Sequence, residues 1–119
     1  MRLFCLFVML GGLVASRGAE LGIASWYGEE LRGRPMANTQ PFDPDKLTCA
    51  HWQHPLGVKL KVTNVANGQF VIVKVTDRGP AKRLNRAIDL SAAAFKRIAD
   101  PRLGLIRVKI EKHLTPIKF

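Results

Sequence analysis

Alternation of apolar and polar residues is clearest in the middle of the chain. Residues 58–65 (VKLKVTNV) alternate with the period of two that gives a β-strand one buried and one exposed face. The pair Asn67-Gly68 follows, and this pair is the strongest short signal for a β-hairpin. Residues 69–76 (QFVIVKVT) then return as the partner strand, and their nearly continuous apolar character predicts burial on both faces.

Two further strands are predicted near the ends of the chain. Residues 21–28 (LGIASWYG) form the first, and it ends in Trp26 and Tyr27. We expect Trp26 to pack in the core, whereas Tyr27 suits either the core or a groove in which sugars stack. Residues 104–111 (GLIRVKIE) form the last strand, whose apolar positions are Leu105, Val108 and Ile110.

The remaining segments are one long connection and one short helix. Residues 29–55 have no sustained period, but they carry apolar anchors, so we expect an ordered functional loop. These anchors are Phe42, Leu47, Cys49 and Trp52. Residues 92–99 predict a helix that begins at an N-cap, Ser91, and ends before Pro101. Four or five strands with one helix and long loops favour a closed barrel, antiparallel or mixed.

The N-terminus has the composition of a secretory leader. A basic start precedes the apolar residues 3–14, a run too short to cross a bilayer, and small residues follow it. We therefore expect residues 1–18 to be a signal peptide and residues 19–119 to be a single domain. Cys5 lies inside the apolar run and not before a cut site, so a periplasmic or secreted protein without a lipid anchor is expected.

The chain is strongly basic, with a formal net charge of +10. Removal of residues 1–18 takes away two arginines and no acids, which leaves +8. The cations are spread along the chain and only 8% of residues are aromatic, so no stacking platform for nucleic acid is predicted. An anionic cell-wall polymer, or weak binding to an anionic surface, fits this charge better, unless it serves solubility alone. We expect a monomer.

The cysteine and histidines suggest little metal chemistry. Cys49 is the only cysteine of residues 19–119, so no disulfide is predicted within the domain. Together with His51 and His54 it forms too small a ligand set, and neither a metal nor another cofactor is expected. Cys49 suits a buried apolar position better than a role as a nucleophile beside His51.

The stretch of residues 71–91 carries the candidate chemistry. A strand ends there in Asp77-Arg78-Gly79-Pro80, and Asp89 follows a basic loop. Two acids that flank a cationic loop suggest acid–base work on a polar substrate. A plain hairpin with solvated charges and a turn-forming aspartate is the alternative.

Six ordered segments of this chain resemble the rare lipoprotein A family. They are ASWYG (24–28), GRPMANTQPFDPDKLTCAH (33–51), PLGVKLKVTN (55–64), NGQ (67–69), DRGP (77–80) and IDLS (88–91). The resemblance implies a six-stranded double-psi β-barrel, here with one short helix, a fold shared with expansins. It also implies an endolytic lytic transglycosylase that cleaves peptidoglycan glycan strands, preferring strands without stem peptides. Such an enzyme cuts between N-acetylmuramic acid and N-acetylglucosamine and leaves a 1,6-anhydro product.

The resemblance also implies the site residues. Asp77, His51 and Asp89 match the catalytic positions, while Gln40 stands where the family commonly has a glutamate. Substrate contacts are expected from Gln40, Arg78, Tyr27 and Asn38. Lytic cleavage needs no water, so one acid–base group with a raised pKa can serve both steps. We expect Asp77 to be this group, with Asp89 as its like-charged neighbour or as the alternate acid.

Gln40 cannot titrate, which leaves a second interpretation open. It is a non-catalytic, expansin-like module that binds peptidoglycan and has lost the acid. A third is a cationic exported module that binds a cell-wall protein or a membrane surface.

Overall fold

A computed structural model describes residues 18–114 of the chain. The predicted signal peptide therefore falls almost entirely outside the described residues. The strands are β1 (Glu20–Tyr27), β2 (Thr48–Ala50), β3 (Lys59–Asn64), β4 (Phe70–Asp77), β5 (Ile88–Ser91) and β6 (Ile106–Lys112). Residues 18–114 also contain the α-helix α2 (Ala92–Ile98) and the short 3₁₀ turns η1 (Glu29–Leu31), η2 (Lys82–Leu84) and η3 (Pro101–Leu103).

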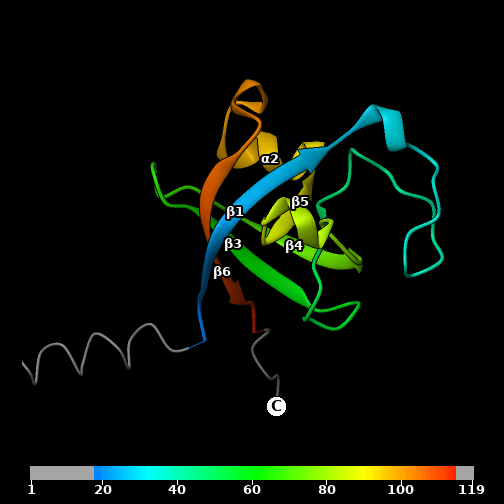
Figure 1. Ribbon diagram of the computed structural model, residues 1–119, viewed down its shortest axis with the longest axis horizontal. Helices are drawn as coiled ribbons and strands as arrows, with labels where there is room; N and C mark the ends of the chain where they lie inside the picture. The colour runs from blue at the N-terminus through cyan, green and yellow to red at the C-terminus, as the bar shows by residue number, and fades with distance from the viewer. Residues whose placement is uncertain (1–17, 115–119) are drawn as a thin grey trace, which may run out of the picture.

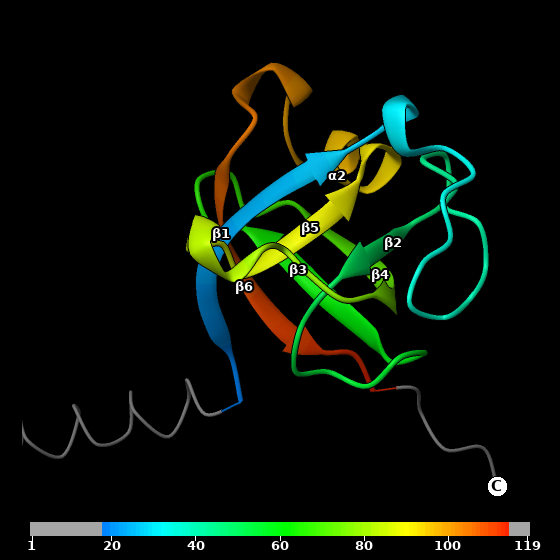
Figure 2. The ribbon, with the colours of Figure 1, turned by 45° about the vertical axis from the view of Figure 1, so that its right-hand side comes forward.

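The six strands close into a barrel in the order β1-β5-β2-β4-β3-β6 (Figures 1 and 2). The pairs β1–β5 and β2–β4 are parallel, and the other neighbours run antiparallel. The predicted mixed closed barrel and the six-stranded double-psi β-barrel are thereby confirmed. Residue pattern alone had not identified β2, which lies inside the long connection, or β5 as strands.

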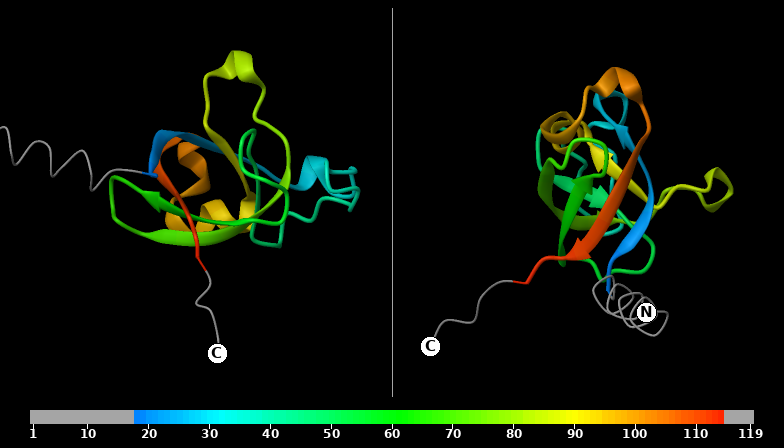
Figure 3. Two further views of the ribbon diagram at one scale, coloured as in Figure 1. Left: turned by 90° about the horizontal axis from the view of Figure 1, so that it is seen from below. Right: turned by 90° about the vertical axis from the view of Figure 1, so that its left-hand side faces the viewer.

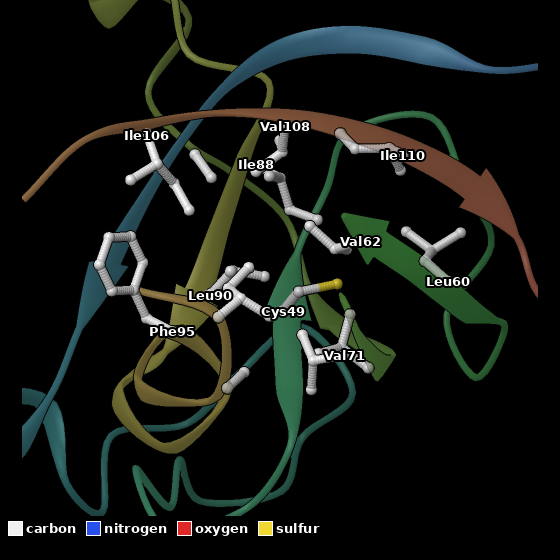
Figure 4. Close-up of a cluster of buried hydrophobic side chains, with 14 of the residues drawn as sticks. Cys49, Leu60, Val62, Val71, Ile88, Leu90, Phe95, Ile106, Val108 and Ile110 are labelled. Carbon is white, nitrogen blue, oxygen red and sulfur yellow. The ribbon is translucent and has the colours of Figure 1, made fainter. Parts of the chain in front are cut away.

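Apolar side chains at alternate positions along the strands fill the barrel interior (Figure 4). Leu60 and Val62 of β3 face Val71 and Val73 of β4 there, as the alternation predicted. Cys49 is also fully buried, which confirms its predicted apolar role.

Two predicted burial patterns are wrong. β4 is not buried on both faces, since Phe70 is 55% exposed and Lys74 is exposed. The register explains this, because Lys74 lies opposite Lys59 on the outer face of β3. In the last strand Ile106 takes the inward position, whereas Leu105, just before the strand begins, is 49% exposed.

The helix begins where the sequence predicted. The Ser91 hydroxyl accepts a hydrogen bond from the Ala94 N–H at 3.3 Å, which confirms the N-cap. The same hydroxyl donates to the Lys46 carbonyl at 2.5 Å and lies 3.4 Å from the Thr48 N–H. Ser91 thus joins the helix, the long connection and β2. The ring of Trp26 packs 6.2 Å from that of Phe95, as expected for a core residue.

Two segments protrude from the barrel wall (Figure 3). One is the chain between β1 and β2, drawn in cyan, and the other is the η2 segment, drawn in yellow-green. The first folds back on itself, since the Gly33 N–H donates to Phe42 O and the Phe42 N–H donates to Arg34 O. This confirms the prediction of an ordered loop, and its tip is residues 36–40. No helix of residues 18–114 has the length and apolar character needed to cross a bilayer.

Candidate active site

Asp77 and Asp89 lie in one row across the barrel wall. Ala50 of β2 is the register partner of Asp77 on β4 and of Asp89 on β5, and Ser25 of β1 is the partner of Asp89. Ile88 and Leu90 on either side of Asp89 fill the core, so Asp89 faces outward, and Asp77 at the end of β4 lines a pocket outside the barrel. Adjacent strands are about 4.8 Å apart, which puts the Cα atoms of the two acids about 10 Å apart.

The carboxylate of Asp77 is held by backbone donors. Its Oδ1 accepts hydrogen bonds from the N–H groups of Ala37 and Arg78, both at 2.9 Å. The first bond fixes the tip of the long loop against the end of β4, and the Asn38 N–H adds a bond to Thr76 O at 3.2 Å. Asp77 lines a pocket of about 240 Å³ between this loop and the barrel. The pocket is formed by Tyr27, Leu31, Arg34, Pro35, Met36, Phe42 and Asp77.

Asp89 is half-buried on β5. The Ser25 hydroxyl donates a hydrogen bond to its Oδ1. Burial raises the pKa of Asp89 above its ordinary value of 3.8; Ser25 and Arg86 oppose this, while the negative charge of Asp77 adds to it. Asp89 therefore keeps its proton to a higher pH than an exposed aspartate does.

Tyr27 brings a hydroxyl to the same acids. Its ring packs on Phe42 with 4.5 Å between ring centroids, and its Oη is buried without a hydrogen-bond partner among the described residues. Burial, and then the charges of Asp77 and Asp89, raise the pKa of this hydroxyl. Tyr27 is thus a protonated donor beside the acid pair.

A second pocket of about 260 Å³ adjoins the first, since Met36 lines both. The loop tip forms part of it, where Asn38 Oδ1 accepts the Gln40 N–H at 3.0 Å and stabilises the tight turn. Gln40 is exposed and lines this second pocket, not the pocket of Asp77. The lining residues are Met36, Asn38, Gln40, Pro41, Asp43, Lys46, Thr48, Lys74 and Thr76.

The ring of His51 points away from the acid pair. It is 1% exposed, and its Nε2 lies 2.9 Å from Oε1 of Glu20. Only the backbone of His51 reaches Asp77, through an N–H donated to Asp77 O at 3.1 Å. Arg78 donates to the carbonyls of His51 and His54 at 2.9 and 2.5 Å, so its guanidinium fixes this turn.

Glu20, His51 and His54 lie close together in the folded barrel, a grouping that was not predicted from the sequence. Their ligand atoms lie within 4.8 Å of one another, a spacing that a metal ion could bridge. However, Nδ1 of His51 accepts the Gln53 N–H at 3.1 Å, with the His54 N–H at 3.4 Å, which assigns the ring proton to Nε2. A metal-bound histidine normally donates from its other nitrogen, so this geometry fits a histidine–carboxylate hydrogen bond better than a metal centre.

Cys49 is unsuited to nucleophilic chemistry. It is fully buried in the barrel core, and burial raises the pKa of its thiol to about 12. Because the thiolate is the reactive form, the thiol is inert in the folded protein.

The site therefore contains most, but not all, of the predicted residues. Asp77, Asp89 and Tyr27 are brought together, and Asn38 and Gln40 lie in the adjoining pocket. His51 and Arg78 support the loop behind Asp77. Sequence reasoning missed Ser25, Lys46 and Lys74, which only the register of β1, β2 and β4 brings to the site.

Fold and site together define a class: a double-psi β-barrel with an acid pair on its outer wall beside two loop-walled pockets. The family model described as lytic transglycolase matches residues 19–110. The chain belongs to this family and, within it, to the rare lipoprotein A (RlpA) group.

Curated relatives share close to half of their aligned residues with this chain. The probable endolytic peptidoglycan transglycosylase RlpA of Synechocystis sp. is 46% identical over 76% of this chain and 28% of its own length. The endolytic peptidoglycan transglycosylase RlpA of Pseudomonas aeruginosa is 45% identical over 83% of this chain and 28% of its own. That of Rickettsia bellii is 46% identical over 84% of this chain and 45% of its own. The chain thus spans less than half the length of these relatives.

Solved structures share the fold. The Streptomyces papain inhibitor superposes with a TM-score of 0.64 at 25% identity, over 78% of this chain and 92% of its own. An expansin variant from Clavibacter michiganensis, crystallised with cellohexaose, gives 0.63 at 22% identity over 84% of this chain and 52% of its own.

Proposed function

We propose that this chain is a lytic transglycosylase that cleaves the glycan strands of peptidoglycan, with Asp89 as the acid–base group. The observation that carries the proposal is the pair of outward-facing acids that share Ala50 as register partner, with the pKa of Asp89 raised by burial and by Asp77. The names of the RlpA relatives support the same reaction class. A peptidoglycan substrate implies an extracytoplasmic place of action.

The reaction requires a proton at the bridging oxygen and a place for a second proton. Asp89 donates its proton to the glycosidic oxygen as the bond from that oxygen to C1 of N-acetylmuramic acid breaks, which frees the 4-hydroxyl of the leaving N-acetylglucosamine. The 6-hydroxyl of the same muramic residue then bonds to its own C1. Its proton passes to Asp89, which restores the acid and leaves a 1,6-anhydro ring. No water takes part, so the arrangement needs no second carboxylate to activate one.

The neighbouring groups have complementary roles in this proposal. Asp77 carries negative charge toward the positive charge that develops at C1. Tyr27 forms part of the wall of the first pocket, and Asn38 and Gln40 contact the next sugar in the second pocket. His51 and Arg78 act as positioning residues, since they hold the turn and the carbonyl behind Asp77.

Digestion of purified glycan strands that lack stem peptides tests the proposal. Mass spectrometry of the native digest is expected to show 1,6-anhydro-muramyl ends. Asp89→Asn keeps the shape and the acceptor for Ser25 but removes the transferable proton, so product formation is expected to fall by about a hundredfold or more. Reducing ends without the anhydro ring would instead identify a hydrolase, and an unchanged rate in Asp89→Asn would exclude Asp89 as the acid.

Gln40 favours one second candidate, a peptidoglycan-binding module without catalysis. A glutamine in the second pocket binds a sugar but transfers no proton. Strands that are bound but never cut by the native chain, and cut by Gln40→Glu, would establish this candidate. If strands with intact stem peptides are protected from cleavage, this result would support the preference for stripped glycan.

A further inference from the structure

Two lysines enter the second pocket with no anion to pair with. Lys74 on β4 is the register partner of Thr48, and its N–H donates to Leu47 O at 3.1 Å. This pairing brings it beside Lys46, and both lysines line the pocket. No salt bridge is found for either lysine within residues 18–114.

One acid, Asp43, lines the same pocket, and its salt bridge is to Arg32 and not to either lysine. Asp43 is engaged by Arg32, whose Nη1 lies 3.4 Å from Oδ1, and that oxygen also accepts the Asp45 N–H at 2.9 Å. Arg32 also binds Glu29 and Asp45, so its one positive charge is shared among three carboxylates. The lining of this pocket holds two lysines and one aspartate, so it keeps a surplus of one positive charge and suits a ligand that carries an anion.

A glycan strand offers one such anion at this place. Muramic acid carries a lactyl ether, whose carboxyl group is an uncharged amide while the stem peptide is attached and a free carboxylate once the peptide has been removed. Two lysines that line one small pocket suit a single carboxylate, since charge-assisted hydrogen bonds are the stronger kind.

We propose that Lys46 and Lys74 bind the free lactyl carboxylate of a muramic residue next to the acid pair, and so select strands without stem peptides. This inference rests on the proposed function, because it assumes that the glycan occupies the groove of Asp77. It assigns the selection to two side chains of the barrel wall and the adjoining loop, and it makes the charge of the lactyl group the feature that is recognised.

Binding measurements on matched ligands test the inference without turnover. Asp89→Asn protein is titrated calorimetrically with stripped strands, and with the same strands after conversion of the lactyl carboxylates to methylamides. We expect about tenfold tighter binding of the free carboxylate, which corresponds to about 1.4 kcal/mol. In Lys46→Gln/Lys74→Gln this preference is expected to vanish, while binding of the amidated strand stays unchanged.

A matched variant controls for net charge. Lys59→Gln/Lys61→Gln removes the same two charges from the outer face of β3, where Lys59 is the cross-strand partner of Lys74 but lines no part of the pocket. It should keep the tenfold preference. Equal affinity of the parent for both ligands, or equal loss in the two double variants, overturns the inference.

The two proposals fail separately. If the free carboxylate is preferred but the native chain forms no anhydro products, the proposal of lytic activity is refuted and the binding site still stands. If anhydro products form at equal rates from free and amidated strands, the proposal of lytic activity stands and the proposed binding site is refuted.

Discussion

Replacement of Ser91 by alanine measures how strongly one buried hydroxyl holds the site together. The hydroxyl caps α2 through the Ala94 N–H and donates to Lys46 O. Loss of an N-cap costs about 1 kcal/mol, and loss of a second hydrogen bond costs about 1 kcal/mol more. The contact to Thr48 N is long at 3.4 Å and adds little. We expect Ser91→Ala to lower the free energy of unfolding by about 2 kcal/mol.

Thermal and urea unfolding followed by circular dichroism measure this loss. For a domain of this size about 2 kcal/mol corresponds to a fall in Tm of about 8–16 °C. The matched control is Asp100→Ala, which removes the cap of η3, where the carboxylate accepts the Arg102 N–H in an exposed position. This control should cost clearly less stability than Ser91→Ala, because the Asp100 cap is exposed to water.

The stability losses of Ser91→Ala and Asp100→Ala together test whether the Ser91 hydroxyl links the helix to the long loop. If Ser91→Ala costs no more than Asp100→Ala, the hydroxyl does not join the helix to the long loop as argued. If it costs the expected amount, glycan binding in the second pocket should weaken as well, because Lys46 is bonded to Ser91 through its carbonyl.

Three other expectations can be checked on the purified protein. Gly22→Ala places a Cβ 2.5 Å from the Cβ of Ala87 and should cost about 1–3 kcal/mol; Ala87→Gly added to it should restore stability, and no rescue would mean that crowding is not the cause. Cys49 should resist alkylation in the native state and react only on unfolding, as read by mass spectrometry of its peptide, and ready native labelling would contradict its burial. The raised pKa of Asp89 favours its protonated form in the fold, so this contribution to stability is present below its unfolded pKa of about 3.8 and lost as the pH rises through the folded value. Asp89→Asn should therefore gain stability over the native protein as the pH rises from about 3 to about 7 in urea titrations, and parallel curves would refute the shift.

Strands with a strict alternation were predictable from sequence because one face of each is buried. That holds for β3 and β6, and the hairpin at Asn67-Gly68 and the N-cap at Ser91 follow from local chemistry. β2 was not predictable from pattern, since its three residues are too few to show a period. They form a strand because β4 and β5 lie on either side of them.

The residues of the candidate site also fall into two groups, those predictable from local sequence and those that only the closed barrel brings together. Asp77 and Asp89 were found because a carboxylate at a strand end or inside an apolar pair is unusual in itself. Glu20 was not, because 31 positions separate it from His51 and only the closed barrel brings the two together. Lys46 and Lys74 were counted as dispersed charge, since their common pocket depends on the pairing of β2 with β4.

The bonds made by Asp77 have a consequence for any mutational study of this barrel. Its Oδ1 holds the loop tip through the Ala37 N–H, so one carboxylate both lines the first pocket and fastens the wall of that pocket. Substitution by alanine removes the fastening and the charge together, whereas asparagine removes the charge and keeps an acceptor oxygen. The difference between Asp77→Ala and Asp77→Asn therefore separates the ordering of the loop from the electrostatics of the reaction, at a single position of the chain.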